Sequence, residues 1–166
     1  ILLIVALLFG SVACGGSQSE GGNVVLNVHM AGDPVAIDPA FAYDNNSSLV
    51  IDQITESLLT HNQDNSLKPN LCTSFEAVDP YTYVYQIRDD VFFSDGSPMT
   101  IDDVVYSIQR HLDPDLGSYM NWFFENVVSI EATGDWEMTI KLAEPQATWQ
   151  YVLATSAGMI VQKEFC

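Results

Sequence analysis

The sequence has 166 residues, enough for one compact domain or for part of a larger one. It carries 22 acidic residues against 5 basic ones, a formal net charge of −17. Such a surface repels phosphate backbones and anionic lipid headgroups, which argues against a nucleic-acid partner and against direct binding of the folded part to a bilayer.

The first nine residues, ILLIVALLF, are wholly apolar. A membrane-spanning helix needs about 20 apolar residues, whereas this run has the length of a signal-peptide core. Small residues at 10–13 precede Cys14, and Gly-Gly-Ser follows, which resembles a bacterial lipobox. We therefore predict a signal peptide over residues 1–13, a diacylglycerol on the thiol of Cys14, and a flexible tether over residues 14–23.

Two features of this segment leave an alternative open. Ser11 stands where a lipobox usually has Leu, so an ordinary cleaved signal with a chance cysteine is the competing interpretation. The sequence starts at Ile1 with neither an initiator Met nor a basic region, so we expect the reading frame to begin further upstream.

After the tether, residues 24–30 alternate weakly and are rich in Val, which predicts a strand. The Asp-Pro pairs at 33–34 and 38–39 end it. Asn45, Asn46 and Ser47 offer N-caps for a helix that we expect to continue to about Leu59. Its predicted apolar face consists of Val50, Ile51, Ile54 and Leu58.

Two further strands are predicted at residues 74–78 and 81–88, around Asp79-Pro80. Strict alternation in the second indicates an antiparallel strand with one buried face. That face is predicted to hold Tyr81, Tyr83, Tyr85 and Ile87. Residues 91–94 are a candidate short strand before the turn Asp95-Gly96.

A second helix is predicted from Thr100, which forms an approximate capping box with Asp103, to Asp113-Pro114. Its expected inner face holds Val104, Val105, Ile108 and Leu112.

The remaining elements are a hairpin, a helical stretch and a strand. Residues 127–132 and 137–142 indicate the hairpin, residues after Pro145 that include Trp149 the helical stretch, and residues 159–161 the start of the strand. The interleaved helices and strands indicate an α/β or mixed α+β fold.

No catalytic constellation is visible in the sequence. The three histidines, His29, His61 and His111, stand far apart, and no nucleophile, zinc or phosphate-loop motif is present. Asp102 and Asp103 fit helix capping better than a proton-sharing pair. We therefore expect neither an enzyme nor a metal or cofactor site.

The other chemistry-bearing residues are cysteines and aromatics. Cys14, Cys72 and Cys166 form no disulfide framework, Cys72 is expected in the core, and we assign no role to Cys166. An aromatic cluster follows the second helix in a Gly/Ser stretch, where it fits equally a ligand cleft or a satellite core. Its members are Tyr119, Trp122, Phe123 and Phe124.

Several stretches together resemble the family 5 extracellular solute-binding proteins, which include the oligopeptide-, dipeptide- and nickel-binding components of ABC transporters. The matching residues run in order through Ile37-Asp38-Pro39, 56–60, 67–71, 83–91, 93–100, 103–110 and 142–145. The sequence departs from the family at Cys72, where Ala is usual, and at Phe75, where Trp is common.

The resemblance implies a periplasmic-binding-protein-like class II fold with two α/β lobes, a hinge, and an extra domain on the first lobe. Family members are far longer, so it also implies an N-terminal fragment that stops before the hinge. By that analogy residues 24–46 begin lobe I, residues 47–158 form the extra domain, and residues 159–166 return into lobe I.

The implied function is reversible capture of a short peptide by lobe closure and delivery to an ABC permease, by a monomer tethered outside the bacterial cell membrane. Carried onto this sequence, the family's ligand-contacting positions are Tyr43, Asp44, Asn45 and Tyr119. Asp44 is the nearest candidate to meet a peptide's ammonium group, and a solvated loop is the alternative.

Other ligands and other classes of function stay open at this point. Within the same fold, nickel, an oligosaccharide or a signalling peptide could be bound. A secreted surface hydrolase with its catalytic residues elsewhere, or a surface module that binds nothing small, are the alternatives from other classes.

Overall fold

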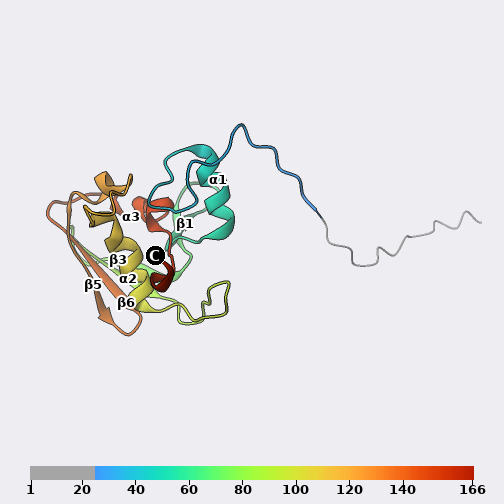
Figure 1. Cartoon of the computed structure of the whole chain (residues 1–166). Helices are drawn as coiled ribbons and strands as arrows, with labels where there is room; N and C mark the ends of the chain where they lie inside the picture. The colour runs from blue at the N-terminus through green and yellow to red at the C-terminus, as the bar shows by residue number, and fades with distance from the viewer. Residues whose placement is uncertain (1–24) are drawn as a thin grey trace, which may run out of the picture.

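The computed structural model describes residues 25–166 (Figure 1). The predicted signal peptide, the lipidation site at Cys14 and the tether over residues 14–23 therefore lie outside the described residues. Within residues 25–166, no helix is long and apolar enough to cross a membrane. In chain order the elements are α1 (Asn45–Ile54), β1 (Leu59–His61), β2 (Leu67–Pro69), β3 (Cys72–Ala77), β4 (Thr82–Ile87), α2 (Ile101–Gln109), η1 (Arg110–Leu112), η2 (Asn121–Phe124), β5 (Val127–Gly134), β6 (Glu137–Leu142), α3 (Trp149–Val152), η3 (Ser156–Gly158) and η4 (Lys163–Phe165).

The centre of the fold is an antiparallel sheet with the strand order β3-β4-β6-β5. A separate two-stranded ribbon pairs β1 with β2. Helix α2 contacts β5 and β6 and covers one face of the sheet. This combination confirms the predicted mixed α/β class and the hairpin that joins β5 to β6.

Strand β4 has the predicted alternation of buried and partly buried residues. Tyr83, Tyr85 and Ile87 are all buried, and Tyr85 lies opposite Met138 of β6. Tyr81 lies just before the strand and is 46% exposed, so its predicted burial is wrong. The alternation of side chains along a strand therefore correctly predicted that these three large side chains share the buried face of the sheet.

The main core gathers these strand residues with side chains from α2, η2 and α3. Phe124 and Trp149 are fully buried and meet edge to face, with ring centroids 5.6 Å apart. Full burial of an aromatic side chain of this size contributes on the order of 2–3 kcal/mol. Cys72 is buried among them, as predicted.

Helix α2 begins with the predicted capping box. Thr100 Oγ1 accepts from the N–H of Asp103, and the Asp103 carboxylate accepts from the N–H of Thr100. The predicted inner position of Leu112 is wrong, because this side chain is 42% exposed. The chain tightens into the 3₁₀ turn η1 at Arg110, and about 120° per residue instead of 100° turns Leu112 away from Ile108.

Helix α1 is shorter than predicted. It ends at Ile54 because Thr55 is extended, and Leu58 and Leu59 donate their N–H groups to Gly158 and Leu153 at 3.0 and 3.1 Å. The helical spacing of apolar residues predicted a helix as far as Leu59, but these long-range hydrogen bonds hold Leu58 and Leu59 outside the helix. As a result Ile54 is 60% exposed.

Four other predicted elements are absent or reduced. Residues 25–30 form no strand, because no strand among residues 25–166 pairs with them. Residues 91–94 and the start at 159 keep only isolated bridges, Phe92 to Pro98 and Ser57 to Met159. The helical stretch after Pro145 shrinks to the four residues of α3.

The segments 56–59 and 158–160 run side by side. Ile160 donates its N–H to the carbonyl of Glu56 at 2.9 Å, and Leu58 donates to Gly158. A small cluster of Ala42, Ile51 and Met159 forms separately from the main core. The part of the chain that holds the central sheet, between residues 59 and 158, therefore begins and ends at neighbouring positions. Helix α1 precedes this part in the sequence.

Candidate ligand-binding surface

Asp44, the predicted ammonium acceptor, is the N-cap of α1. Its Oδ1 accepts from the N–H groups of Asn46 and Ser47 at 3.0 and 2.9 Å, and its Oδ2 accepts from the Ser47 hydroxyl. The side-chain hydrogen bond from Ser47, followed by the backbone bond, lowers the pKa of Asp44 below its ordinary value. Asp44 therefore stays ionised at neutral pH while it caps the helix.

Tyr43 and Tyr119 come from distant parts of the chain and meet at the surface. Their ring centroids are 5.2 Å apart and the ring planes are nearly perpendicular, at 78°. Tyr43 is 64% exposed and Tyr119 is 57% exposed. Phe41 adds a second edge contact to Tyr119 at 6.1 Å. The pair leaves large aromatic faces open beside the N-terminus of α1, where Asn45 is the first helical residue and is also exposed.

The backbone holds these two tyrosines in place. The N–H of Tyr119 donates to the carbonyl of Ala40 at 2.9 Å, and the hydroxyl of Ser118 donates to the same carbonyl at 3.0 Å. The four residues predicted from the family resemblance thus lie in one region of the surface. We name this region, Tyr43, Asp44, Asn45 and Tyr119, the tyrosine surface.

The other aromatics after α2 divide between surface and core. Phe124 is fully buried and stacks on His111 with centroids 4.8 Å apart. Trp122 is 58% exposed and stacks on Phe123 at 3.6 Å. Phe124 thus belongs to the main core, and for the exposed members of the cluster the ligand-cleft interpretation stays a prediction.

Sequence reasoning missed the ion pair that anchors the loop before Tyr43. Arg110 makes two hydrogen bonds to the Asp38 carboxylate, at 3.0 and 2.8 Å. Both residues lie in stretches that resemble the family, but 72 positions separate them. A single sequence gives no signal that pairs them.

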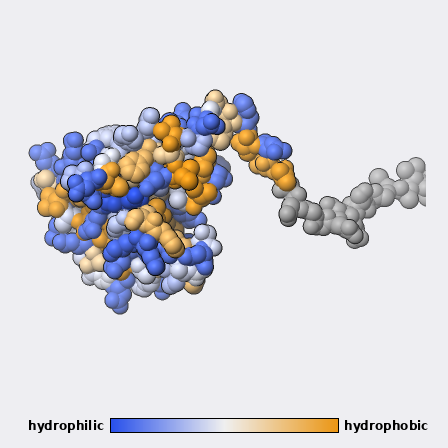
Figure 2. Space-filling view, in the orientation of Figure 1, coloured by the Kyte–Doolittle hydropathy of each residue, from blue (hydrophilic) through white to orange (hydrophobic). Residues whose placement is uncertain are grey.

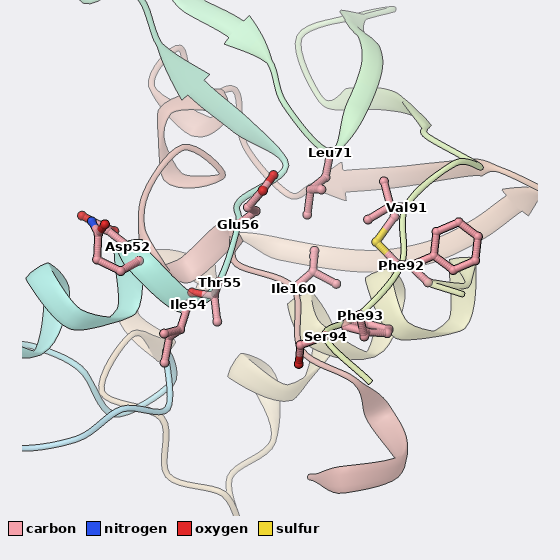
Figure 3. Close-up of a pocket in the computed structure, with 12 residues that line it drawn as sticks. Asp52, Ile54, Thr55, Glu56, Leu71, Val91, Phe92, Phe93, Ser94 and Ile160 are labelled. Atoms are coloured by element: carbon pink, nitrogen blue, oxygen red, sulfur yellow. The ribbon is translucent and has the colours of Figure 1, made fainter. Parts of the chain in front are cut away.

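A cavity of about 290 Å³ lies at the opposite end of α1 (Figure 3). The cavity lies between the end of that helix and the segment after β4. None of the four residues of the tyrosine surface lines it. Its walls include Asp52, Thr55, Glu56, Val91, Phe92 and Ile160. Across the visible face of the molecule, hydrophilic side chains alternate with hydrophobic patches (Figure 2).

No group of three or more His, Cys, Asp or Glu side chains within residues 25–166 is arranged to hold a metal ion. The histidines are dispersed as the sequence indicated, with His61 and His29 exposed and His111 buried.

Residues 66–165 match the family model described as bacterial extracellular solute-binding proteins, family 5 Middle. The chain belongs to this family. The match covers β2 through η4 and so includes the whole central sheet.

Similar family 5 proteins bind peptides, according to their names. The periplasmic murein peptide-binding protein MppA of Escherichia coli is 33% identical over 57% of this chain and 18% of its own length. The oligopeptide-binding protein OppA of Bacillus subtilis is 32% identical over 69% of this chain and 22% of its own length. This chain therefore spans about a fifth of these relatives.

Solved structures agree with the fold. The murein tripeptide-binding protein MppA of E. coli superposes with a TM-score of 0.77 and 26% identity, over 82% of this chain and 30% of that one. The oligopeptide-binding protein AppA of B. subtilis, solved with a nonapeptide, gives a TM-score of 0.74 and 25% identity over 81% and 27%. The fold class expected from the resemblance is thus confirmed.

Proposed function

We propose that this chain is part of the substrate-binding lipoprotein of an ABC importer that captures short peptides for uptake, and that it makes and breaks no covalent bond. The observation that carries the proposal is the pair of exposed rings of Tyr43 and Tyr119 beside the N-terminus of α1. The peptide-binding names of the family 5 relatives support the ligand class.

The tyrosine surface suits a ligand of variable sequence. Aromatic faces supply contact area to different side chains without demanding one hydrogen-bond pattern. Each carboxylate oxygen of Asp44 has two acceptor positions, and Oδ2 accepts one hydrogen bond from the protein. The remaining position can accept an N–H of a peptide's ammonium group, so Asp44 can cap α1 and bind ligand together.

We further propose that residues 24–46 begin lobe I and that the chain returns to lobe I at Met159. The pairing of segments 56–59 and 158–160 supports an inserted extra domain between them. The small cluster of Ala42, Ile51 and Met159 favours α1 as part of lobe I. On this ground we propose that α1 joins residues 24–46 in lobe I, which moves the proposed start of the extra domain from residue 47 to near Glu56.

Outside the cell, the proposed anchor is a diacylglycerol on Cys14, followed by the tether at residues 14–23. Metabolic labelling with a radioactive fatty acid tests this anchor in the producing bacterium. Label on the wild-type protein and none on Cys14→Ser is the expected result, and equal label on both removes the anchor from the proposal.

Calorimetric titration of the product of the complete reading frame against pools of dipeptides to pentapeptides tests the function. Binding in at least one pool is expected, and Tyr119→Ala should weaken it ten-fold or more. No heat with any pool contradicts peptide capture, and heat with nickel or an oligosaccharide instead changes the ligand class. The 166-residue chain alone should bind weakly, because a ligand held between two lobes would have only one of them.

A further inference from the structure

Arg110 is a buried cation with a defined partner. The residue is 8% exposed, and its two terminal nitrogens donate to the two carboxylate oxygens of Asp38. A cation removed from water is tolerated only when it is paired in good geometry. This two-point contact therefore fixes where Asp38 lies relative to η1.

Asp38 in turn shapes the loop that leads to Tyr43. Its Oδ1 also accepts from the N–H of Ala40 at 2.9 Å, and its carbonyl accepts from the N–H of Phe41 at 3.0 Å. One carboxylate thus holds the turn over residues 38–41 and the guanidinium of Arg110. Tyr43 follows that turn by two residues.

A second contact holds the other tyrosine. The carbonyl of Ala40 can only accept a hydrogen bond, so the Ser118 hydroxyl is the donor in this contact. The Ser118 oxygen, 2.8 Å from His111 Nδ1, then has no hydrogen left to give to the ring. For that hydrogen bond the ring donates from Nδ1, but the backbone of Ala157 also forms a hydrogen bond with the ring, so the contact to Ser118 holds His111 without fixing its tautomer.

The His111 ring is itself immobilised. It is 2% exposed and lies nearly parallel to Phe124, at 11°. It holds Ser118, whose neighbour Tyr119 donates its own N–H to Ala40. Arg110 thus acts on Tyr43 through Asp38, and the adjacent His111 acts on Tyr119 through Ser118. We call the contacts Arg110–Asp38, His111–Ser118 and Ser118–Ala40 the loop anchor.

We propose that Arg110 and His111 are positioning residues of the tyrosine surface: through Asp38 and Ser118 they set Tyr43 against Tyr119 in the arrangement that receives ligand. This inference rests on the proposed function. Neither residue touches the ligand in this scheme.

Arg110→Met and Arg110→Lys test the first route in the full-length protein. The matched control is Arg88→Met, which removes an exposed two-point contact of the same chemistry to Asp90, at 2.8 and 3.0 Å. We expect Arg110→Met to lose the ring-to-ring nuclear Overhauser signals between Tyr43 and Tyr119 and to weaken peptide binding at least ten-fold. Arg110→Lys should recover part of both, and Arg88→Met should change neither.

Ser118→Ala and ¹⁵N NMR of the imidazole test the second route, and keep the proposal testable if Arg110→Met does not fold. Ser118→Ala should shift the ¹⁵N signal of His111 Nδ1, the atom 2.8 Å from the Ser118 oxygen, and should weaken peptide binding several-fold in a folded protein. An Nδ1 signal that Ser118→Ala leaves unchanged, or tyrosine ring signals and affinity that survive in every folded variant, overturns the proposal. A wild-type protein that binds no peptide overturns the proposed function as well, whereas variants that lose the ring signals at unchanged affinity overturn only the positioning role.

Discussion

One carboxylate oxygen of Asp103 accepts a hydrogen bond from the N–H of Lys163, 60 residues further along the chain, at 2.9 Å. The other oxygen accepts from the N–H of Thr100 at 2.9 Å and closes the capping box of α2. Asp103 is only 7% exposed. A residue recognised in the sequence as a helix cap therefore also fastens the last segment of the chain to α2.

This double role predicts a large effect of Asp103→Ala. It should lower the free energy of unfolding by about 2–3 kcal/mol, because it removes a cap and leaves the Lys163 N–H without its acceptor. Urea denaturation measures the loss. The exposed neighbour gives the control, since Asp102→Ala should cost about 0.5 kcal/mol or less. Equal effects of the two substitutions would contradict the second role.

Burial of His111 predicts a pH dependence of stability. Desolvation, helped by the nearby Arg110 charge and opposed by Asp38, lowers the pKa of His111 from 6.5 to about 4. Between these pH values the unfolded chain binds a proton that the folded chain does not. The free energy of unfolding should therefore fall as pH drops from 6.5 to 4, by on the order of 3 kcal/mol.

Urea denaturation of the wild type and of His111→Gln, at about pH 7 and about pH 4.5, isolates this contribution. All other side chains are the same in both proteins, so their contributions to the pH dependence cancel in the comparison. A shallower pH dependence in His111→Gln is expected. The same slope in both proteins would show that His111 does not titrate with unfolding.

The two described cysteines should differ in reactivity. Cys72 is 1% exposed and burial raises the pKa of its thiol to about 11, whereas Cys166 is exposed. At about pH 8 roughly one Cys72 side chain in a thousand is then a thiolate. In the folded 166-residue chain, iodoacetamide should modify Cys166, whereas Cys72 should react only in denaturant. Mass spectrometry of each cysteine peptide separates them, and native labelling of Cys72 at a similar rate would refute its burial.

Gly158 lies where no side chain fits. A Cβ atom there would meet the Leu153 carbonyl oxygen at 2.2 Å, and this is backbone that cannot move aside easily. Gly158→Ala should lower the free energy of unfolding by about 2–3 kcal/mol. Gly134→Ala is the control, because its Cβ would approach only the Glu137 side chain closely, at 3.2 Å, and should cost about 1 kcal/mol or less. Thermal denaturation of both variants tests whether Gly158→Ala is the more destabilising substitution.

Local signals in the sequence predicted the parts of the fold that local physics decides. The Thr100–Asp103 capping box and the alternation of Tyr83, Tyr85 and Ile87 are confirmed. The predicted end of the first helix is wrong, because Leu58 and Leu59 bond to residues about a hundred positions away. A period of apolar residues cannot show which backbone partner will compete for them.

The candidate site shows the same division. The four residues of the tyrosine surface were reached by resemblance to family 5, and the structure places Tyr43 beside Tyr119. Neither propensity nor spacing predicted that contact. The Arg110–Asp38 contact of the loop anchor was missed, because an ion pair across 72 positions leaves no local pattern.

The paired segments 56–59 and 158–160 also bear on how this molecule can be altered. Because Glu56 and Ile160 are hydrogen-bonded neighbours, a linker of two or three residues could replace the whole span between them, or a foreign span could be grafted there. Tyr119 lies inside that span and Tyr43 outside it. An exchange between relatives would therefore carry one ring of the pair and leave the other, so recombination at this junction would replace one side of the tyrosine surface in a single step.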